Sequence, residues 1–148
     1  MEENKHIVCY PFVGDSIGGS QLATIILMKN LHKIDYSYKV ILSEKGPLER
    51  ILKKENINYK ILDIKKKNLS GNFLKTLLFS ISQSIRFRNF LKENEINIIH
   101  TNDVRMHYFW SVICWINGLP HIWHQHSAYF SRRNIFFSRL SKSILTVS

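Results

Sequence analysis

Paired glycines lie near the start of the chain, at a place where they could hold a phosphate group. Gly18-Gly19 separates an apolar run, residues 6–10, from a run with helical patterning, residues 21–31. Glycine lets the backbone come close to a ligand, and the first N–H groups of a helix have no helical partner, so they can bind an anion. An ordinary tight turn between a strand and a helix would look the same, because short glycine motifs occur by chance. The pair alone leaves both interpretations open.

Histidines gather in the second half of the chain, and they raise the question of a metal site. His124 and His126 are two residues apart, a spacing that places both on one face of a strand. His100 and His121 are further candidates for the same cluster. No cysteine, aspartate or glutamate beside them completes a recognisable ligand set, so we expect no bound metal.

A nicotinamide site is a second reading of the glycine loop. Glu44 follows the second apolar run at about the place where a carboxylate would hold the ribose of a dinucleotide. The glycines at 14, 18 and 19 do not have the Gly-x-Gly-x-x-Gly spacing of that motif. We therefore do not expect a nicotinamide cofactor.

Length and composition predict one folded domain that spans residues 1–148. The chain is 45% hydrophobic and 12% aromatic, which is typical of a globular protein with a real core. Residues 1–5 contain acids where a signal peptide has a basic segment, and the most apolar stretch, 108–116, is too short to span a bilayer. Cys9 and Cys114 lie in core-patterned segments without metal or redox spacing, which predicts buried thiols in a reducing cytoplasm.

The charge is strongly basic and favours an anionic partner. Lys and Arg total 21 against 11 acids, for a net charge of +10. Nucleic acid, acidic lipid headgroups and phosphorylated substrates all fit such a field. The basic residues are dispersed apart from residues 65–67 and 132–133, and no nucleic-acid-binding motif is recognisable. We therefore do not expect a nucleic-acid partner.

Strand-like and helix-like segments alternate along the whole chain, as parallel βαβ units require. We predict strands at residues 5–10, 38–42, 59–62, 97–100, 121–124 and 143–147. We predict helices at residues 19–32, from Gly46-Pro47 onward, and at 73–92, 104–116 and 134–141. This order predicts an α/β fold with a doubly wound, Rossmann-like parallel sheet of about six strands.

Two of these helices carry apolar stripes that we expect to pack on the sheet. In the first helix the stripe consists of Leu22, Ile25, Ile26 and Leu27. In the helix at 73–92 it consists of Leu74, Leu77, Leu78, Ile81 and Ile85, extended by Phe79, Phe87 and Phe90. Lys75, Arg86, Arg88 and Lys92 add positive charge to the second helix. We expect core packing there, with contact to an anionic membrane as the alternative, since basic amphipathic helices bind such surfaces.

Five short segments occur in an order that is similar to a known family. They are residues 18–31, 46–59, 98–102, 118–127 and 143–148. Together they resemble the N-terminal, acceptor-side domain of a GT-B glycosyltransferase of the family 4 type, over nearly the whole chain. Asn102 and Ser127 stand where that family often has His and Gly, and Gln21 stands where Glu is commoner.

The resemblance implies a retaining transferase that moves a sugar from a nucleotide-sugar donor, in cell-surface polysaccharide or glycolipid synthesis. Gly18 and Gly19 would then hold the departing phosphate. His126 matches the family's histidine and would be the catalytic residue, although a loop histidine packed under a helix is the alternative.

The acceptor would bind at the end of the fourth strand. His100, Asn102 and Asp103 lie there and would contact acceptor hydroxyls on the same edge of the sheet as His126. For Asn102 a local Asx turn before the next helix is an equal alternative.

The resemblance also implies a second domain that holds most donor contacts and has no counterpart in this chain. We therefore expect an acceptor-side half of a transferase that is inactive alone, needs no cofactor or metal, and acts in the cytoplasm or on the inner membrane face. Its partners would be a nucleotide-sugar and a sugar or lipid-linked acceptor. Two alternatives are a subunit of a split transferase, whose donor half is another chain, and a noncatalytic basic module that binds a membrane or a polyanion.

Overall fold

The computed structural model of the chain describes residues 6–31, 37–64, 69, 72–127 and 131–147, and the basic run at 65–67 lies outside them. Six strands form one parallel sheet in the order β3-β2-β1-β4-β5-β6. They are β1 (Ile7–Phe12), β2 (Ser37–Leu42), β3 (Tyr59–Ile61), β4 (Ile98–Thr101), β5 (His121–Gln125) and β6 (Ser143–Thr146). The predicted doubly wound, Rossmann-like sheet is thereby confirmed.

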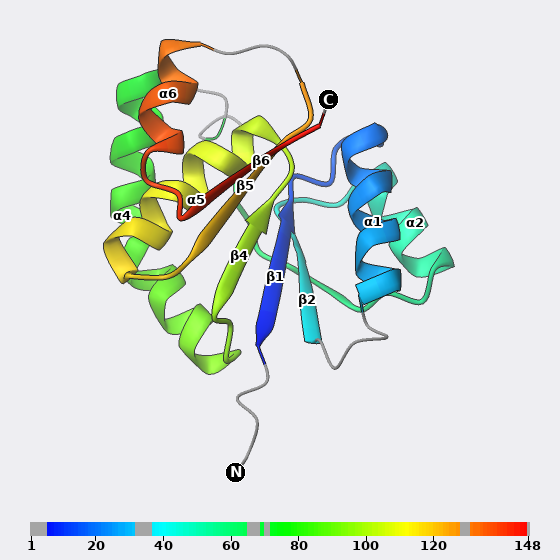
Figure 1. Cartoon of the computed structure of the whole chain (residues 1–148). Helices are drawn as coiled ribbons and strands as arrows, with labels where there is room; N and C mark the ends of the chain where they lie inside the picture. Colours follow the sequence, from blue (N-terminus) through cyan, green and yellow to red (C-terminus); the bar gives the residue numbers. More distant parts are fainter. Residues whose placement is uncertain (1–5, 32–36, 65–68, 70–71, 128–130, 148) are drawn as a thin grey trace.

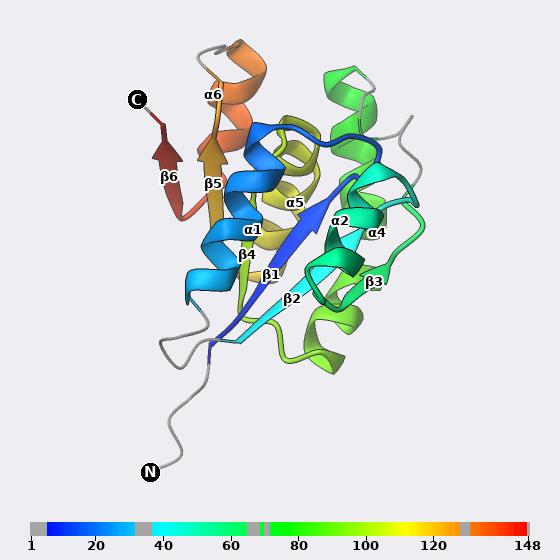
Figure 2. The ribbon, with the colours of Figure 1, turned by 90° about the vertical axis from the view of Figure 1, so that its right-hand side faces the viewer.

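Helices cover both faces of the sheet (Figure 1). They are α1 (Gly19–Leu31), α2 (Pro47–Lys54), α4 (Phe73–Glu93), α5 (Val104–Asn117) and α6 (Arg132–Ser138). Figures 1 and 2 show α1 and α2 on one face, and α4, α5 and α6 on the other. Each helix lies within a few residues of its predicted position, because proline and glycine mark the ends: Pro47 begins α2, and Gly118 closes α5 in the left-handed conformation with φ 64°.

Each face of the sheet has its own apolar core. On the side of α1 and α2, Tyr10 and Phe12 of β1 pack with residues of both helices. On the other side, Cys9 and Ile99 pack with α4 and α5. Cys114 of α5 lies in the same core, so both cysteines are buried free thiols as predicted.

The buried face of α1 differs from the one that its apolar residues suggest. Ile25 is buried as predicted, but Leu22 and Ile26 are 42% and 61% exposed, and Leu27 is partly exposed. The face that packs on the sheet consists of Gln21, Thr24, Ile25 and Met28. These positions follow the i, i+3, i+4, i+7 spacing of one helix face, and Leu22 and Ile26 lie next to that face. The predicted stripe is therefore wrong at Leu22 and Ile26.

The expected orientation of α4 is also wrong for most of its stripe. Leu74, Leu78, Ile81 and Ile85 are all exposed, and Ile85 is 75% exposed. The buried face instead consists of Thr76, Ser80, Ser84, Phe87 and Leu91. Phe79 and Phe90 pack against the core beside Phe87. Leu77 packs against a smaller apolar cluster that includes Phe137 of α6. These four residues follow the prediction.

Small hydroxyl residues account for this orientation of α4. Thr76, Ser80 and Ser84 are short enough for α4 to lie closely against its neighbours. Their polar atoms are satisfied without water: Ser80 donates to the Thr76 carbonyl at 2.8 Å, and Ser84 donates to the Ile81 carbonyl at 2.7 Å. Arg133 of α6 donates to the Thr76 hydroxyl at 2.7 Å. A buried hydroxyl costs little once it is hydrogen-bonded, so this face can replace a leucine stripe.

Candidate functional site

The loop between β1 and α1 is shaped by glycines that only the tertiary structure explains. Gly14 has φ +102°, and a Cβ there would lie 2.3 Å from the backbone oxygen of Glu44. A Cβ at Gly46 would lie 2.3 Å from the backbone oxygen of Gly14. The loops after β1 and β2 therefore touch backbone to backbone, which fixes the course of the chain from β1 towards α1.

Gly18 and Gly19 lie at the N-terminus of α1. The Gly18 carbonyl accepts the first helical hydrogen bond, from the Leu22 N–H at 3.1 Å. The N–H groups of Gly19, Ser20 and Gln21, which precede Leu22 in the helix, have no helical partner. A Cβ at Gly19 would meet nothing within 4 Å, so the backbone of this first helical residue faces open space. An anion can approach it there.

A cavity of about 540 Å³ lies where α1 begins and β4 and β5 end. It is lined by Gly19, Ser20, Asn102, Asp103, Val104, Arg105, His107, Gln125, His126 and Ser127. Four residues that the sequence singled out, Gly19, Asn102, Asp103 and His126, are thus brought into one cavity wall. Gly18 precedes this wall in the chain, and His100 is not part of it.

Asn102 and His126 face each other across the ends of β4 and β5. The Nε2 atom of His126 lies 3.3 Å from Oδ1 of Asn102, so the imidazole donates this hydrogen bond. The Nδ2 atom of Asn102 is buried and has no hydrogen-bond partner among the described residues. A buried amide that lacks an acceptor is costly, and a ligand oxygen in the cavity would supply one.

His100 lies behind this wall in a ladder of rings. It is 5% exposed, and its ring centroid lies 5.0 Å from that of Tyr10 and 5.4 Å from that of His124. The ring centroid of His124 in turn lies 4.1 Å from that of His126. In this position His100 supports the cavity-lining histidine through His124 and does not face the cavity itself.

Burial keeps the histidines of this region neutral. It lowers the pKa of His100 to about 4, and the neighbouring His124 and His126 lower it further in the same direction. Burial also lowers the pKa of His126 and of His124. A neutral imidazole offers one donor and one acceptor, so at neutral pH the ladder acts through hydrogen bonds and not through charge.

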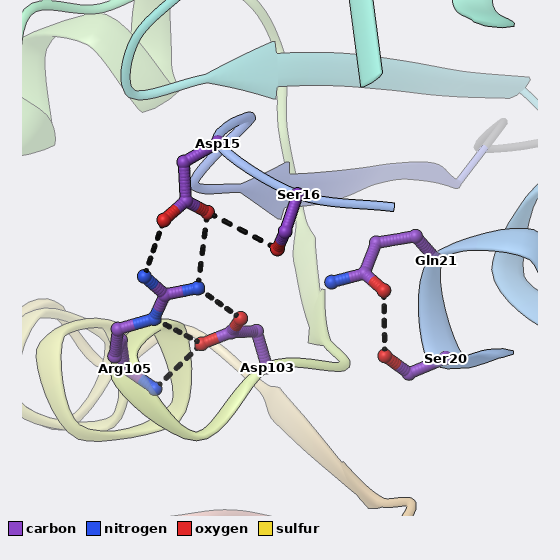
Figure 3. A network of polar contacts seen from close by, with 6 residues as sticks. All are labelled: Asp15, Ser16, Ser20, Gln21, Asp103 and Arg105. Carbon is purple, nitrogen blue, oxygen red and sulfur yellow. Dashed lines mark hydrogen bonds and ion pairs between the residues drawn. The ribbon is translucent and has the colours of Figure 1, made fainter. Parts of the chain in front are cut away.

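Asp15, Asp103 and Arg105 form a charged group (Figure 3). Two of these residues, Asp103 and Arg105, line the cavity. Arg105 Nη1 lies 2.9 Å from Asp15 Oδ2, and Arg105 Nη2 lies 2.8 Å from Asp103 Oδ2. The two carboxylates raise the pKa of the Arg105 guanidinium, so it stays charged. The contact joins the loop after β1 to the start of α5, and two carboxylates face one guanidinium. Asp103 lines the cavity, and a carboxylate oxygen can accept a hydrogen bond from a hydroxyl group as well as from a guanidinium.

The local turn that the sequence allowed at Asn102 is made one residue later. Asp103 is the N-cap of α5 and accepts a hydrogen bond from the Arg105 N–H at 2.8 Å. Because Asp103 satisfies the start of the helix, the Asn102 side chain is left to face His126. Of the two readings of Asn102, the cavity-facing one agrees with this geometry.

The sequence analysis assigned no site role to six further residues that line the cavity: Ser20, Val104, Arg105, His107, Gln125 and Ser127. Arg105 had a local signal, since an Asp-x-Arg spacing follows β4. His107 had none, because it lies in an apolar run of α5 that reads as core. In the part of the chain that the structure describes, no group of three or more His, Cys, Asp or Glu side chains could hold a metal ion.

Comparison with known families gives one match. The family model described as Glycosyltransferase Family 4 matches residues 17–148. No curated protein is significantly similar to the chain.

Several solved structures share the fold at low sequence identity. MurG of Acinetobacter baumannii is 18% identical, with a TM-score of 0.68 over 97% of this chain and 41% of that chain. Anabaena HepE in complex with UDP and glucose is 15% identical, with a TM-score of 0.63 over 93% and 37%. The lipopolysaccharide outer core galactosyltransferase WaaB is 13% identical, with a TM-score of 0.57 over 94% and 38%. The chain thus spans about two fifths of the length of these structures, which are GT-B glycosyltransferases.

Proposed function

The chain belongs to glycosyltransferase family 4, and we propose that its cavity forms the acceptor side of a retaining sugar-transfer site. The donor is a nucleotide-sugar, and the acceptor is a sugar or a lipid-linked sugar in cell-surface polysaccharide or glycolipid synthesis. Support comes from the fold, which is that of GT-B glycosyltransferases, and from the solved complex of HepE with UDP and glucose.

One observation carries the proposal: the N-terminus of α1 and the His126–Asn102 pair line the same cavity. The free N–H groups at Gly19 are suited to hold the departing diphosphate, because hydrogen-bond donors aimed at developing charge lower the barrier to its formation. In this proposal His126 contacts the sugar that is transferred, and Asn102 Nδ2 donates to a sugar oxygen. The carboxylate of Asp103 accepts hydrogen bonds from acceptor hydroxyls.

Most donor contacts would come from a second domain. Because the chain spans about two fifths of its structural neighbours, we propose that this domain follows in the same polypeptide or belongs to a partner chain. Residues 1–148 by themselves would then bind an acceptor but transfer no sugar. Neither a metal nor a cofactor enters this scheme.

A hybrid enzyme tests the proposal. The donor domain of a relative is joined after Ser148, and sugar transfer from UDP-glucose and other nucleotide-sugars is measured. In an active hybrid, His126→Ala is expected to lower kcat about a hundredfold or more, which corresponds to the roughly 2.7–4 kcal/mol that one transition-state contact contributes elsewhere. His6→Ala is the matched control, since His6 is exposed just before β1, at the opposite end of the sheet. Full activity of the His126→Ala hybrid would contradict the assigned role.

A second proposal concerns where the enzyme acts: α4 rests on an anionic membrane. Leu74, Leu78, Ile81 and Ile85 lie on one side of the helix and are exposed. Lys75 and Arg86 flank this stripe, and Arg88 and Lys92 continue it. In α4 the hydroxyl residues face the core, and leucine and isoleucine face outward. An apolar outer face of this kind is suited to contact with lipid. No described helix is long and apolar enough to cross a bilayer.

Position along the fold links this surface to the cavity. Helix α4, which carries the stripe, begins near the end of the sheet at which β4 and β5 stop (Figure 1). Beside the stripe, Phe73 packs edge to face on Phe136 of α6, with ring centroids 5.0 Å apart, and both rings are partly exposed. A lipid-linked acceptor held by the membrane would therefore reach the cavity along this side. The noncatalytic membrane module is the competing function, and the hybrid assay above separates the two.

A further inference from the structure

A chain of four buried or partly buried polar groups leads from the start of β6 to the cavity. The Oγ atom of Ser141 lies 2.8 Å from Nδ1 of His121. The Nε2 atom of the same imidazole lies 2.8 Å from Oγ1 of Thr101, and this oxygen lies 2.6 Å from Nδ1 of His107. His107 lines the cavity, and because Thr101 occupies its Nδ1, its Nε2 is the nitrogen left for a ligand.

The chemistry of these groups couples their protons. Burial lowers the pKa of His121 to about 3 and the pKa of His107 well below its usual range, so each ring is neutral and has one N–H. Thr101 has a single hydroxyl proton. It can give this proton to one histidine only, and it must accept from the other. The remaining contact of Thr101, with the Ile122 carbonyl, is longer at 3.4 Å and competes poorly.

Two arrangements satisfy all three short contacts. In the first, His121 donates from Nε2 to Thr101, and Thr101 donates to Nδ1 of His107, so that His107 carries its proton on Nε2. In the second, His121 donates from Nδ1 to Ser141 and accepts from Thr101 at Nε2. Thr101 then accepts from His107, which leaves Nε2 of His107 as an acceptor. A change from one arrangement to the other reverses the donor and the acceptor in all three contacts.

We propose that this relay of Ser141, His121, Thr101 and His107 decides whether His107 offers the cavity a hydrogen-bond donor or an acceptor. His107 is thereby a specificity-determining residue, and Ser141, His121 and Thr101 are positioning residues. A deprotonated phosphate oxygen only accepts hydrogen bonds, so it binds the donor arrangement. A sugar hydroxyl binds either one. The ligand selection rests on the function proposed above, whereas the relay itself depends only on the contacts within the chain.

Two substitutions of Ser141, which does not line the cavity, are expected to favour opposite arrangements of the relay. In Ser141→Ala the Nδ1 atom of His121 has no acceptor, and a buried N–H without a partner is costlier than a bare lone pair. The variant therefore favours the donor arrangement of His107. In Ser141→Asp the carboxylate accepts from Nδ1 of His121, which favours the acceptor arrangement. At pH 8 this His121 stays neutral, since its pKa rises from about 3 by roughly 1 to 3 beside a carboxylate.

The test is the tautomer of His107, read by NMR from the nitrogen and carbon shifts of histidine-labelled protein, residues 1–148, at pH 8. The expected result is mostly Nε2–H in Ser141→Ala and mostly Nδ1–H in Ser141→Asp. Both effects are expected to disappear in a Thr101→Val background, because valine cannot pass the change on. Ser143→Asp is the matched control; it adds the same charge two residues away, at an exposed position, and is expected to leave His107 as in the wild type.

Binding of inorganic pyrophosphate then tests the consequence for ligands. Ser141→Ala is expected to bind this probe at least fivefold more tightly than Ser141→Asp. If the tautomer of His107 is the same in both variants, the relay is overturned, whatever the cavity binds. If the tautomer changes but pyrophosphate binding is equal or absent in both, the relay stands as a structural chain and its role in ligand selection is overturned. Neither result depends on sugar transfer, so failure of the proposed function is recognised separately in the hybrid enzyme.

Discussion

The sequence predicts two regions of the molecule to different degrees. One is the cavity at the ends of β4 and β5, and the other is the outer face of α4. Asn102, Asp103 and His126 line the cavity as expected, because a residue that follows a parallel strand must lie at the carboxyl edge of the sheet. Ile85 and its apolar neighbours on α4 face outward, although their spacing is that of a core stripe. Strand ends are fixed by topology, whereas the buried face of a helix depends on what its neighbours can accept.

Substitutions on the two sides of α4 give the largest expected contrast. Phe87 is fully buried among Phe109 and Trp110, so Phe87→Ala should lower the free energy of unfolding by about 3–5 kcal/mol. Ile85 is exposed, and Ile85→Ala should change the same quantity by less than about 0.5 kcal/mol. Denaturant unfolding of both variants measures the difference. Equal losses would mean that the apolar stripe is buried in solution and that the two regions do not differ.

The pH dependence of stability should come from the cavity region. In the unfolded chain the pKa of His100 is about 6.5, and in the folded protein it is about 4. The unfolded state therefore binds more protons between these values, so stability is complete above pH 6.5 and is lost as the pH falls towards 4. This one group should account for about 3 kcal/mol of that loss.

Unfolding curves of His100→Asn between pH 7 and 4 measure this contribution. The variant should be less stable than the wild type at pH 7 and should show a flatter pH dependence. His6→Asn, which changes an exposed histidine, should keep the dependence of the wild type. If His100→Asn keeps the full slope, the protonation of His100 does not oppose folding.

Membrane binding should come from the α4 stripe and should be the smallest of the three effects in free energy. Vesicles with anionic headgroups are expected to bind the wild-type protein, and neutral vesicles to bind it weakly. Leu78→Glu with Ile85→Glu should reduce binding to anionic vesicles about tenfold or more, because charge enters the apolar surface. Leu22→Glu with Ile26→Glu is the matched control, because it adds the same two charges at exposed positions of α1, which lies on the other face of the sheet. Equal loss in the control would show that net charge alone, and not the stripe, controls binding.

The fold itself could be read from the sequence because its signals are local. Alternating strand and helix patterns place all six strands and the described helices within a few residues of their observed bounds. Pro47 and Gly118 mark the boundaries, since each favours one backbone conformation. The positions of Gly19 and His126 at the same edge follow from the parallel order of the strands alone.

Long-range contacts decided the remaining features. Arg105 joins the cavity wall because Asp15, ninety positions away in the chain, lies beside it in the folded structure. His107 lies in an apolar run of the sequence, and only the folded structure shows the hydrogen bond with Thr101 that this buried side chain makes. The orientation of α4 depends on whether small hydroxyl residues or leucines fit better against α5 and α6. Periodicity gives the spacing of a helix face, but the choice of which face is buried is made by the packing partners.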